Sequence, residues 1–229
     1  MLTPVDGGTG LWQAAQFLKP VVSSLFDSVS QRDAENKMAK LVVSENLSLD
    51  GVVEDPTGEQ GFLHGGWFDQ SVGGDREAWA KVEYAEALRA AALLIGRRTD
   101  EYFGSRWNSR SGDWPDRLNG LPKYVVSTTL EDPVWVNSTV LSGDIVAQIT
   151  KLKREIDGEI VVYASRQLVH TLMEHDLVDE LRLIVFPVVL GSGERLFGDT
   201  EDKKPLHLCS VQAVGDGLML LTYGIIREV

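Results

Sequence analysis

Cysteine is almost missing from this sequence of 229 residues, in which Cys209 is the only one. A single cysteine excludes a disulfide within the chain and a metal site built from several thiolates. The four histidines have no partners at metal-ligand spacing, so we expect no metal cofactor. A chain without disulfides suits a reducing compartment, and we therefore expect a cytoplasmic protein.

Positive charge and long apolar runs are also scarce. Lys and Arg total 22 against 34 Asp and Glu, which gives a formal net charge of −12. An acidic surface disfavours nucleic acid as a partner, because phosphate backbones attract cations. No stretch approaches the roughly 20 apolar residues of a membrane span, and no basic segment precedes an apolar core as in a secretory signal. We expect a small-molecule substrate, with neither nucleic acid nor a membrane as a partner.

The first 37 residues differ in composition from the rest of the chain. They combine a turn-like start, a short apolar stretch that is broken by Pro20, and a polar stretch. We predict an N-terminal appendage over residues 1–37, in part helical, and one domain over residues 38–229. The alternative is a helix in this segment that docks on the domain or on a second subunit.

From Met38 onward, strand and helix patterns alternate. Near-continuous apolar strands between amphipathic helices predict a mainly parallel sheet that is covered on both faces. Gly215-Asp216-Gly217 is typical of a hairpin turn, so the C-terminal strands should be antiparallel. Asp75 and Asp144 are the expected helix caps. The predicted strands span residues 40–49, 93–96, 121–130, 158–165, 179–191, 205–214 and 218–229, and the predicted helices span 75–91, 143–156 and 166–177.

Hydroxyl groups and cations follow three of these strands. In open α/β sheets, ligands bind beyond the carboxyl ends of the strands. The N–H groups at a helix start favour an anion, and arginine presents forked donors that suit phosphate oxygens. These features together predict a phosphate-bearing ligand such as a dinucleotide, although no Gly-x-Gly-x-x-Gly follows any strand. The groups are Gly96, Arg97, Arg98 and Thr99 after the first strand, Ser127 and Thr128 after the second, and Ala164, Ser165 and Arg166 after the third.

Four segments carry a resemblance to a known family. They are "SENLSLDGVVEDP", "LLIGRRTDEYF", "LPKYVVSTTL" and "VVYASRQLVHTLMEHDLVDELRLIVFPVVLGSGERLF", and together they resemble the dihydrofolate reductase-like family. The phrase "LVDELRL…FPVVLGSGERLF" is most similar to the branch of the C-terminal reductase domain of bacterial riboflavin biosynthesis. The resemblance covers roughly residues 39–227. It implies a three-layer α/β fold of the dihydrofolate reductase type, with NADPH as cofactor and often a homodimer.

The resemblance also implies which residues hold the cofactor. Gly96, Arg97 and Thr99, with Arg98 beside them, match the family's phosphate loop. Family members usually have glycine where this chain has Ala164, and a Cβ there obstructs close backbone approach or a positive φ angle. The remaining matches are Ser127 and Thr128 near the adenosine 2′-phosphate, and Tyr163, Ala164, Ser165, Arg166 and Leu168 around the pyrophosphate.

Three residues are candidates for catalysis or substrate contact. Asp50 matches a family motif at the end of the first strand and is a candidate catalytic residue, the alternative being an Asp-Gly turn. His64 and Trp67 lie in "FLHGGWFD" and are candidate substrate contacts, the alternative being that they order this loop. Dihydrofolate reductases keep a carboxylate on the helix after the first strand. The helix here offers Asp75, Glu77, Glu83 and Glu86, of which we expect Glu83 to be solvated.

These features predict an NADPH-dependent reductase of a nitrogen heterocycle or of a phosphoribosylamino-pyrimidine. The branch implies a 5-amino-6-(5-phosphoribosylamino)uracil reductase-like activity without a deaminase half, since no His/Cys zinc signature is present. The alternative is a non-catalytic nucleotide-binding or oligomerisation module on the same fold. We also predict a homodimer that covers an exposed edge strand at "LMLLTYGII", residues 218–226.

Overall fold

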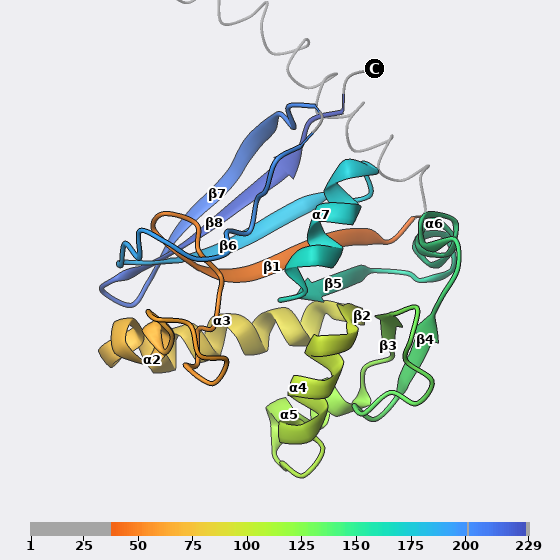
Figure 1. Ribbon diagram of the computed structural model, residues 1–229, viewed down its shortest axis with the longest axis horizontal. Helices are drawn as coiled ribbons and strands as arrows, with labels where there is room; N and C mark the ends of the chain where they lie inside the picture. Colours follow the sequence, from red (N-terminus) through yellow and green to blue (C-terminus); the bar gives the residue numbers. More distant parts are fainter. Residues whose placement is uncertain (1–37, 201, 228–229) are drawn as a thin grey trace, which may run out of the picture. The chain divides into compact units, whose positions relative to one another are not determined.

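The computed structural model describes residues 38–200 and 202–227, and the predicted appendage lies outside them. The described chain forms one sheet of eight strands with helices on both faces (Figure 1). The elements are β1 (Lys40–Ser48), α2 (Trp67–Val72), the 3-10 turn η1 (Gly73–Asp75), α3 (Arg76–Arg89), β2 (Ala90–Gly96), α4 (Arg97–Trp107), α5 (Asp113–Gly120), β3 (Lys123–Val126), β4 (Ser138–Leu141), α6 (Ile145–Glu155), β5 (Glu159–Tyr163), α7 (Arg166–Glu174), β6 (Glu180–Phe186), β7 (Leu206–Val214) and β8 (Leu218–Ile225).

The strand order is β4-β3-β2-β5-β1-β6-β8-β7. Strand β1 lies in the middle and pairs in parallel with β5 and β6, while β8 is antiparallel to both β6 and β7. The first six strands therefore end at the same edge of the sheet, and their carboxyl ends can share a ligand. This topology confirms the predicted parallel sheet with an antiparallel C-terminal hairpin.

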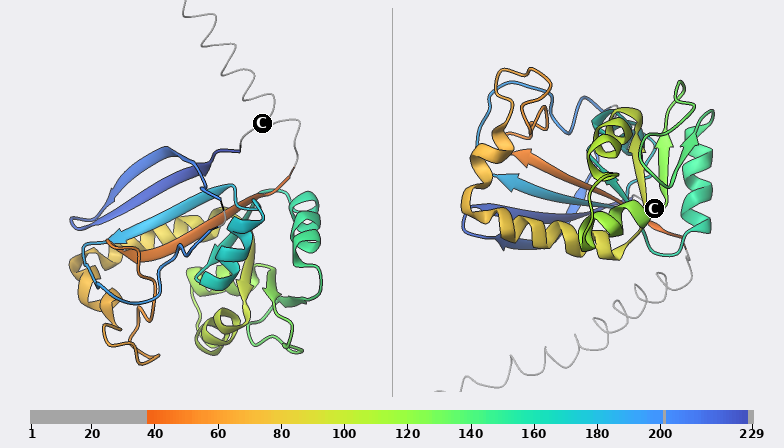
Figure 2. Two further views of the ribbon diagram at one scale, coloured as in Figure 1. Left: turned by 45° about the horizontal axis from the view of Figure 1, so that its top comes forward. Right: turned by 90° about the horizontal axis from the view of Figure 1, so that it is seen from below.

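Strand β1 shows how the two faces are covered. Leu41 and Val43 pack in the cluster that holds the apolar side chains of α6 and α7, whereas Val42 packs with Ala87 of α3. Successive side chains of a strand point to opposite faces, so an unbroken apolar run is required where both faces are covered. Figure 2 shows these layers from two further sides. None of the described helices is long and apolar enough to cross a membrane.

Several element boundaries differ from the sequence prediction. Residues 90 and 91 were assigned to a helix, but β2 begins at Ala90, because Ala90 and Ala92 pair with β5. The strand predicted over 121–130 is only Lys123–Val126, since the Ser127 hydroxyl accepts hydrogen bonds from the next turn and bends the chain there. The prediction left α2, α4, α5 and β4 unassigned.

Two predictions near the C-terminal hairpin were wrong. Strand β8 is not an edge, because it lies between β6 and β7, and the edge strand is β7. Asp75 stands directly before α3 but does not cap it; its carboxylate accepts hydrogen bonds from the N–H groups of Asp216 and Gly217 at 2.9 and 2.8 Å. Asp144 does cap α6, as predicted, by accepting from the N–H of Ala147 at 3.0 Å.

Candidate functional site

The carboxyl ends of β1, β2, β3 and β5 open into one cleft of about 940 Å³. Its volume is in the range of small-molecule and cofactor sites. Every residue that the sequence analysis assigned to the cofactor lines this cleft, so the fold brings the three predicted strand ends together. They are Gly96, Arg97, Arg98, Thr99, Ser127, Thr128, Tyr163, Ala164, Ser165, Arg166 and Leu168. That they bind a cofactor stays a prediction.

The hydroxyl of Ser165 joins two of these strand ends. Its Oγ accepts a hydrogen bond from the N–H of Gly96 at 2.9 Å and donates to Oγ1 of Thr99 at 2.8 Å. Ser165 occupies the N-cap position of α7, but its side chain makes no capping bond. The hydroxyl instead fixes the start of α7 against the start of α4.

One end of the cleft is suited to anions. Helices α4 and α7 both begin beside it, and helix N-termini attract negative charge. Arg97 is paired with Glu101 at 2.9 Å and Arg166 with Glu194 at 2.6 Å. Arg98 has no acceptor among the described residues, so its guanidinium is the cation most available to a ligand.

The backbone between β5 and α7 is left-handed at two successive residues. Ala164 has φ 48° and Ser165 has φ 61°, a region that residues other than glycine adopt at a cost. From the sequence, a Cβ at position 164 was expected to oppose a positive φ angle. The structure has this angle with alanine in place. The two helix starts, the free Arg98 and the hydroxyls around this turn fit the phosphates of a dinucleotide.

The other end of the cleft is aromatic. The rings of Trp79 and Trp114 lie 5.8 Å apart, those of Trp107 and Trp114 lie 5.3 Å apart, and Phe68 packs against Trp79 at 4.8 Å. The indole Nε1 of Trp79 donates to Oδ1 of Asn46 at 2.9 Å, which fixes both side chains. These residues all line the cleft, so a flat ring could stack there.

Two carboxyl groups lie at this aromatic end, and one corrects a prediction. Glu83 was expected to be solvated, but the residue is only 8% exposed and lines the cleft. Trp79 lies one turn earlier on the same face of α3, and its packing places this face over β1. Glu45, the second, comes from β1; its carboxyl is enclosed by protein although the residue as a whole is partly exposed. The sequence analysis missed Glu45, since an acidic residue inside a strand carries no motif.

Burial dominates the protonation of this pair. It raises the pKa of Glu45 to about 8, against a smaller lowering by the hydrogen bond from the N–H of Asn46. Burial also raises the pKa of Glu83 to about 8, with further increases from the charges of Glu86 and Glu45. The pKa of Tyr163, which also lines the cleft, is raised by burial and by the charges of Glu86 and Glu83. Burial therefore favours the protonated forms of Glu45 and Glu83.

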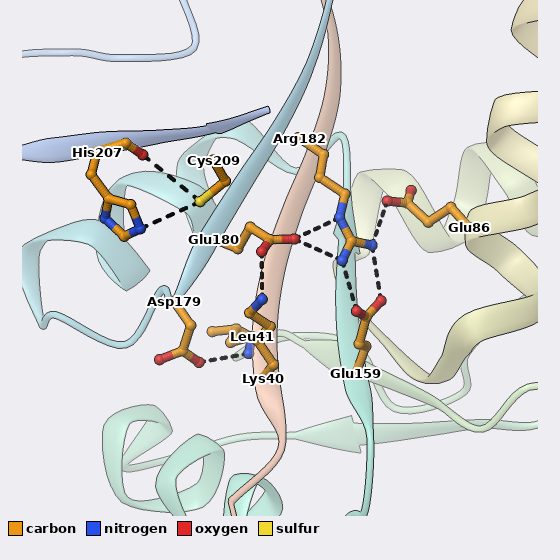
Figure 3. A network of polar contacts seen from close by, with 9 residues as sticks. All are labelled: Lys40, Leu41, Glu86, Glu159, Asp179, Glu180, Arg182, His207 and Cys209. Carbon is orange, nitrogen blue, oxygen red and sulfur yellow. Dashed lines mark hydrogen bonds and ion pairs between the residues drawn. The ribbon is translucent and has the colours of Figure 1, made fainter. Parts of the chain in front are cut away.

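A charge network lies next to this acidic end (Figure 3). The guanidinium of Arg182 on β6 bonds Oε1 of Glu86 at 3.0 Å, Oε1 of Glu159 at 2.7 Å and Oε1 of Glu180 at 2.7 Å. Lys40 pairs with the second oxygen of Glu180. Glu86 is one turn beyond Glu83 on α3, so the network fixes the helix that carries the cleft carboxyl.

Asp50 does not line the cleft. Its carboxylate accepts from Ser48 Oγ at 2.8 Å and from the N–H groups of Leu190 and Gly191 at 3.1 and 2.9 Å. Burial raises its pKa, but these hydrogen bonds outweigh that effect and lower the pKa of Asp50 to about 2. This geometry favours the structural alternative, in which Asp50 holds the loop after β6.

The candidate substrate residues are also outside the cleft lining. Trp67 is 1% exposed, packs in a core cluster and donates its indole N–H to the carbonyl of Glu54 at 2.8 Å, so it cannot reach a substrate. His64 is exposed and lies edge-on to Phe62 at 5.5 Å. Both positions agree with the alternative that these residues order the loop.

The left-handed turn makes Ala164→Gly a stabilising substitution. The change removes roughly 1–2 kcal/mol of backbone strain and costs about 0.5–1 kcal/mol of chain entropy, so the free energy of unfolding should rise by up to about 1 kcal/mol. Ala85→Gly, on the exposed face of α3, is the matched control and should lower it by about 1 kcal/mol. Urea titration measures the free energy of unfolding of both variants, and an equal loss of stability in the two would contradict the strain argument.

Asp50→Asn tests the structural role of that residue. Because the folded pKa of about 2 lies below the ordinary 3.8, Asp50 stabilises the fold above pH 4, and this contribution disappears as the pH falls toward 2. The mutant should therefore melt at a lower temperature than the wild type at pH 7, with a gap that closes between pH 4 and 2. Asp132→Asn, an exposed control, should show no gap. Lost turnover in Asp50→Asn at unchanged stability would instead support catalysis.

Comparison with known proteins places this fold and cleft in a family. The chain is 25% identical to the uncharacterized protein YyaP of Bacillus subtilis over 195 residues, which are 82% of this chain and 95% of YyaP. A putative riboflavin biosynthesis protein from Shewanella sp. PV-4 has a TM-score of 0.65 at 22% identity, covering 82% of this chain and 99% of the other. Dihydrofolate reductase from Enterococcus faecalis, solved with NADP(H), has a TM-score of 0.50 at 13% identity, covering 82% and 97%.

The structural likenesses confirm the predicted dihydrofolate reductase-like fold. The sequence model of the RibD C-terminal domain matches residues 39–220, which is most of the chain. This match includes all the strand ends that form the cleft. The chain therefore belongs to the RibD C-terminal domain family, as the resemblance of its motifs indicated.

Proposed function

We propose that the protein is an NADPH-dependent reductase of a nitrogen heterocycle or of a phosphoribosylamino-pyrimidine of the riboflavin pathway. The observation that carries this proposal is the composition of the cleft. Its anion end and its aromatic, acidic end share one cavity of about 940 Å³, so a dinucleotide and a flat substrate ring can meet inside it. A cytoplasmic location belongs to the same proposal, since the exposed thiol of Cys209 suits a reducing compartment.

The residues of this chain would bind the cofactor, orient the substrate and exclude water. When bound, NADPH supplies the hydride, which the protein does not provide. The starts of α4 and α7 and the guanidinium of Arg98 would hold the phosphates, with Ser127 and Thr128 near the 2′-phosphate. The tryptophan side chains would exclude water and position the substrate ring, and the protonated carboxyl groups of Glu45 and Glu83 would be the proton source nearest to it.

The cofactor part of the proposal predicts a preference between two nicotinamides. NADPH should raise the melting temperature more than NADH, because only NADPH carries the 2′-phosphate and a bound ligand stabilises the native state. Arg98→Ala should weaken the binding free energy of NADPH by about 1.5–3 kcal/mol, the scale of a charge-assisted hydrogen bond. Arg97→Ala should weaken it less, because Arg97 already pairs with Glu101.

Arg154→Ala is the control for these variants, since this exposed arginine near the end of α6 removes the same charge outside the cleft. An equal shift of the melting temperature with NADPH and NADH, or no shift with either, would contradict the proposal. NADPH oxidation is followed by absorbance with a panel of heterocycles that includes 5-amino-6-(5-phosphoribosylamino)uracil. Binding of NADPH without oxidation of any kind would favour the non-catalytic binding module.

A homodimer is also part of the proposal, through β7 rather than β8. The edge strand β7 is exposed along nearly its whole length and presents Leu206, Leu208 and Val211 to solvent. An exposed apolar edge is a template for pairing with another strand. Light scattering at micromolar concentration should give the dimer mass, and Leu208→Lys should give the monomer. Leu63→Lys, at another exposed leucine, should remain dimeric, and a wild-type monomer would refute the proposal.

A further inference from the structure

His207 and Cys209 form an exposed pair on the edge strand β7. Nε2 of His207 and Sγ of Cys209 lie 3.4 Å apart, and the sulfur also lies 3.9 Å from the carbonyl oxygen of His207 (Figure 3). The pairing of β7 with β8 skips Cys209, as at a bulge, and bulges re-aim side chains. Within the described chain neither side chain bonds any other residue, which leaves a thiol and an imidazole nitrogen open to a ligand.

The separation of these two donor atoms matches a tetrahedral zinc site. Zinc binds sulfur at about 2.3 Å and imidazole nitrogen at about 2.0–2.1 Å, so a tetrahedral angle places the two ligand atoms roughly 3.5 Å apart. The observed 3.4 Å therefore suits two ligands of one ion as well as it suits a thiol–imidazole hydrogen bond. Thiolate and imidazole are ligands of zinc, whereas magnesium and calcium take oxygen ligands.

The imidazole owes its place to the lack of a side chain at Gly224 of β8. Gly224 pairs with His207, and a Cβ at this position would collide with the ring. The ring thus fills the space that a side chain of β8 would take, so one ligand is positioned before any ion binds. Glu180 pairs with Gly224 from the other side, but its carboxylate bonds Lys40 and Arg182 and is no further ligand (Figure 3).

One chain supplies only half of such a site. Throughout residues 38–200 and 202–227, no three His, Cys, Asp or Glu side chains lie together in a way that could hold a metal. A structural zinc ion takes four ligands, so two more must come from outside the chain. Because β7 is an open edge, a second copy can approach it, and two-fold symmetry presents the same pair of side chains from both copies. The sequence analysis considered ligands within one chain and for that reason expected no metal.

We propose that His207 and Cys209 of two copies of this chain bind one zinc ion between them, in a Cys2His2 site on the two-fold axis of the dimer. With this axis near Leu208, antiparallel β7 strands place His207 opposite the partner's Cys209. Residues that stand directly opposite in antiparallel strands have Cβ atoms about 4.5–5.5 Å apart, which is within reach of one ion. The inference rests on the dimer of the proposed function and on no part of the reductase activity.

The proton balance of binding follows from the two ligand types. Each thiol loses its proton to the solvent as its sulfur–zinc bond forms, so two protons leave for each ion. Each imidazole is neutral and binds through the lone pair of Nε2, with its proton on Nδ1. Zinc thus takes the place of the proton that the thiol shares with the imidazole in the metal-free chain.

Zinc titration of the full chain without an affinity tag tests the inference. The protein is stripped of metal with a chelator and kept in a phosphine reductant, which also prevents a disulfide between two copies. Competition with a chromophoric chelator should give one zinc ion for two chains. Analytical ultracentrifugation should show the dissociation constant of the dimer falling about tenfold when free zinc is about ten times its own dissociation constant. One ion for each chain, or an unchanged dimer constant, would overturn the inference.

Variants assign the ligands. Cys209→Ser and His207→Ala should each abolish the effect of zinc on the dimer constant, and both should fold, because the side chains they change are exposed. His175→Ala removes an exposed imidazole outside β7 and should keep the zinc effect. Cobalt in place of zinc should give a thiolate-to-cobalt charge-transfer band that Cys209→Ser lacks. Zinc that still tightens the dimer in both β7 variants would refute the site.

The outcomes separate the zinc site from the proposed function. A dimer in chelator that zinc does not tighten leaves the proposed dimer intact and refutes only the site. A monomer in chelator that zinc converts to a dimer supports the site, and a monomer under both conditions refutes the site and the dimer together. The NADPH melting shift is measured with zinc and with chelator, and its absence in both refutes the reductase without bearing on the zinc site.

Discussion

The arrangement of the acidic end depends on one cation, Arg182. Its guanidinium bonds carboxylates from α3, β5 and β6, three elements that would otherwise bring like charges together in a low-dielectric interior. A single guanidinium with forked donors can satisfy several carboxylates at once, which an ammonium group cannot do in the same geometry. The hydrogen bond from Arg182 lowers the pKa of Glu159, and the carboxylates raise the pKa of Arg182 despite its burial. These shifts favour the charged forms of Arg182 and Glu159.

Glu86 connects this network to the cleft. Burial is the main cause of the raised pKa of Glu83, and the charge of Glu86 beside it adds to the effect. The bond from Arg182 to Glu86 ties α3, whose Glu83 and Trp79 line the cleft, to β6. The network and the cleft therefore share one helix. Loss of Arg182 would leave the buried Glu86 and Glu180 and the half-buried Glu159 without their shared cation, which is far more costly than the loss of a surface pair.

The sequence predicts most of the sheet and the anion end, for physical reasons that are local. The run around Leu41–Val43 must be a central strand because both of its faces are apolar, and parallel strands necessarily bring Gly96, Ser127 and Ser165 to one edge. The short strand β4 and the helix α5 were not predicted, since neither has enough apolar periodicity to be recognised without its neighbours.

The acidic end could not be predicted, because it depends on tertiary contacts. Whether Glu83 is solvated follows from where α3 rests on the sheet, and that depends on contacts with distant parts of the chain, such as the bond from Glu86 to Arg182. Asp50 is the opposite case, in which a recognisable motif suggested catalysis and the geometry favours the alternative of a turn. Its two carboxylate oxygens are already occupied by Ser48 and by the backbone of the loop after β6. A carboxylate with its acceptors filled and a pKa near 2 is poorly suited to exchange protons near neutral pH, whereas an unsupported one with a pKa near 8 is well suited. Of these two carboxyl groups, Glu83 lines the cleft and Asp50 does not.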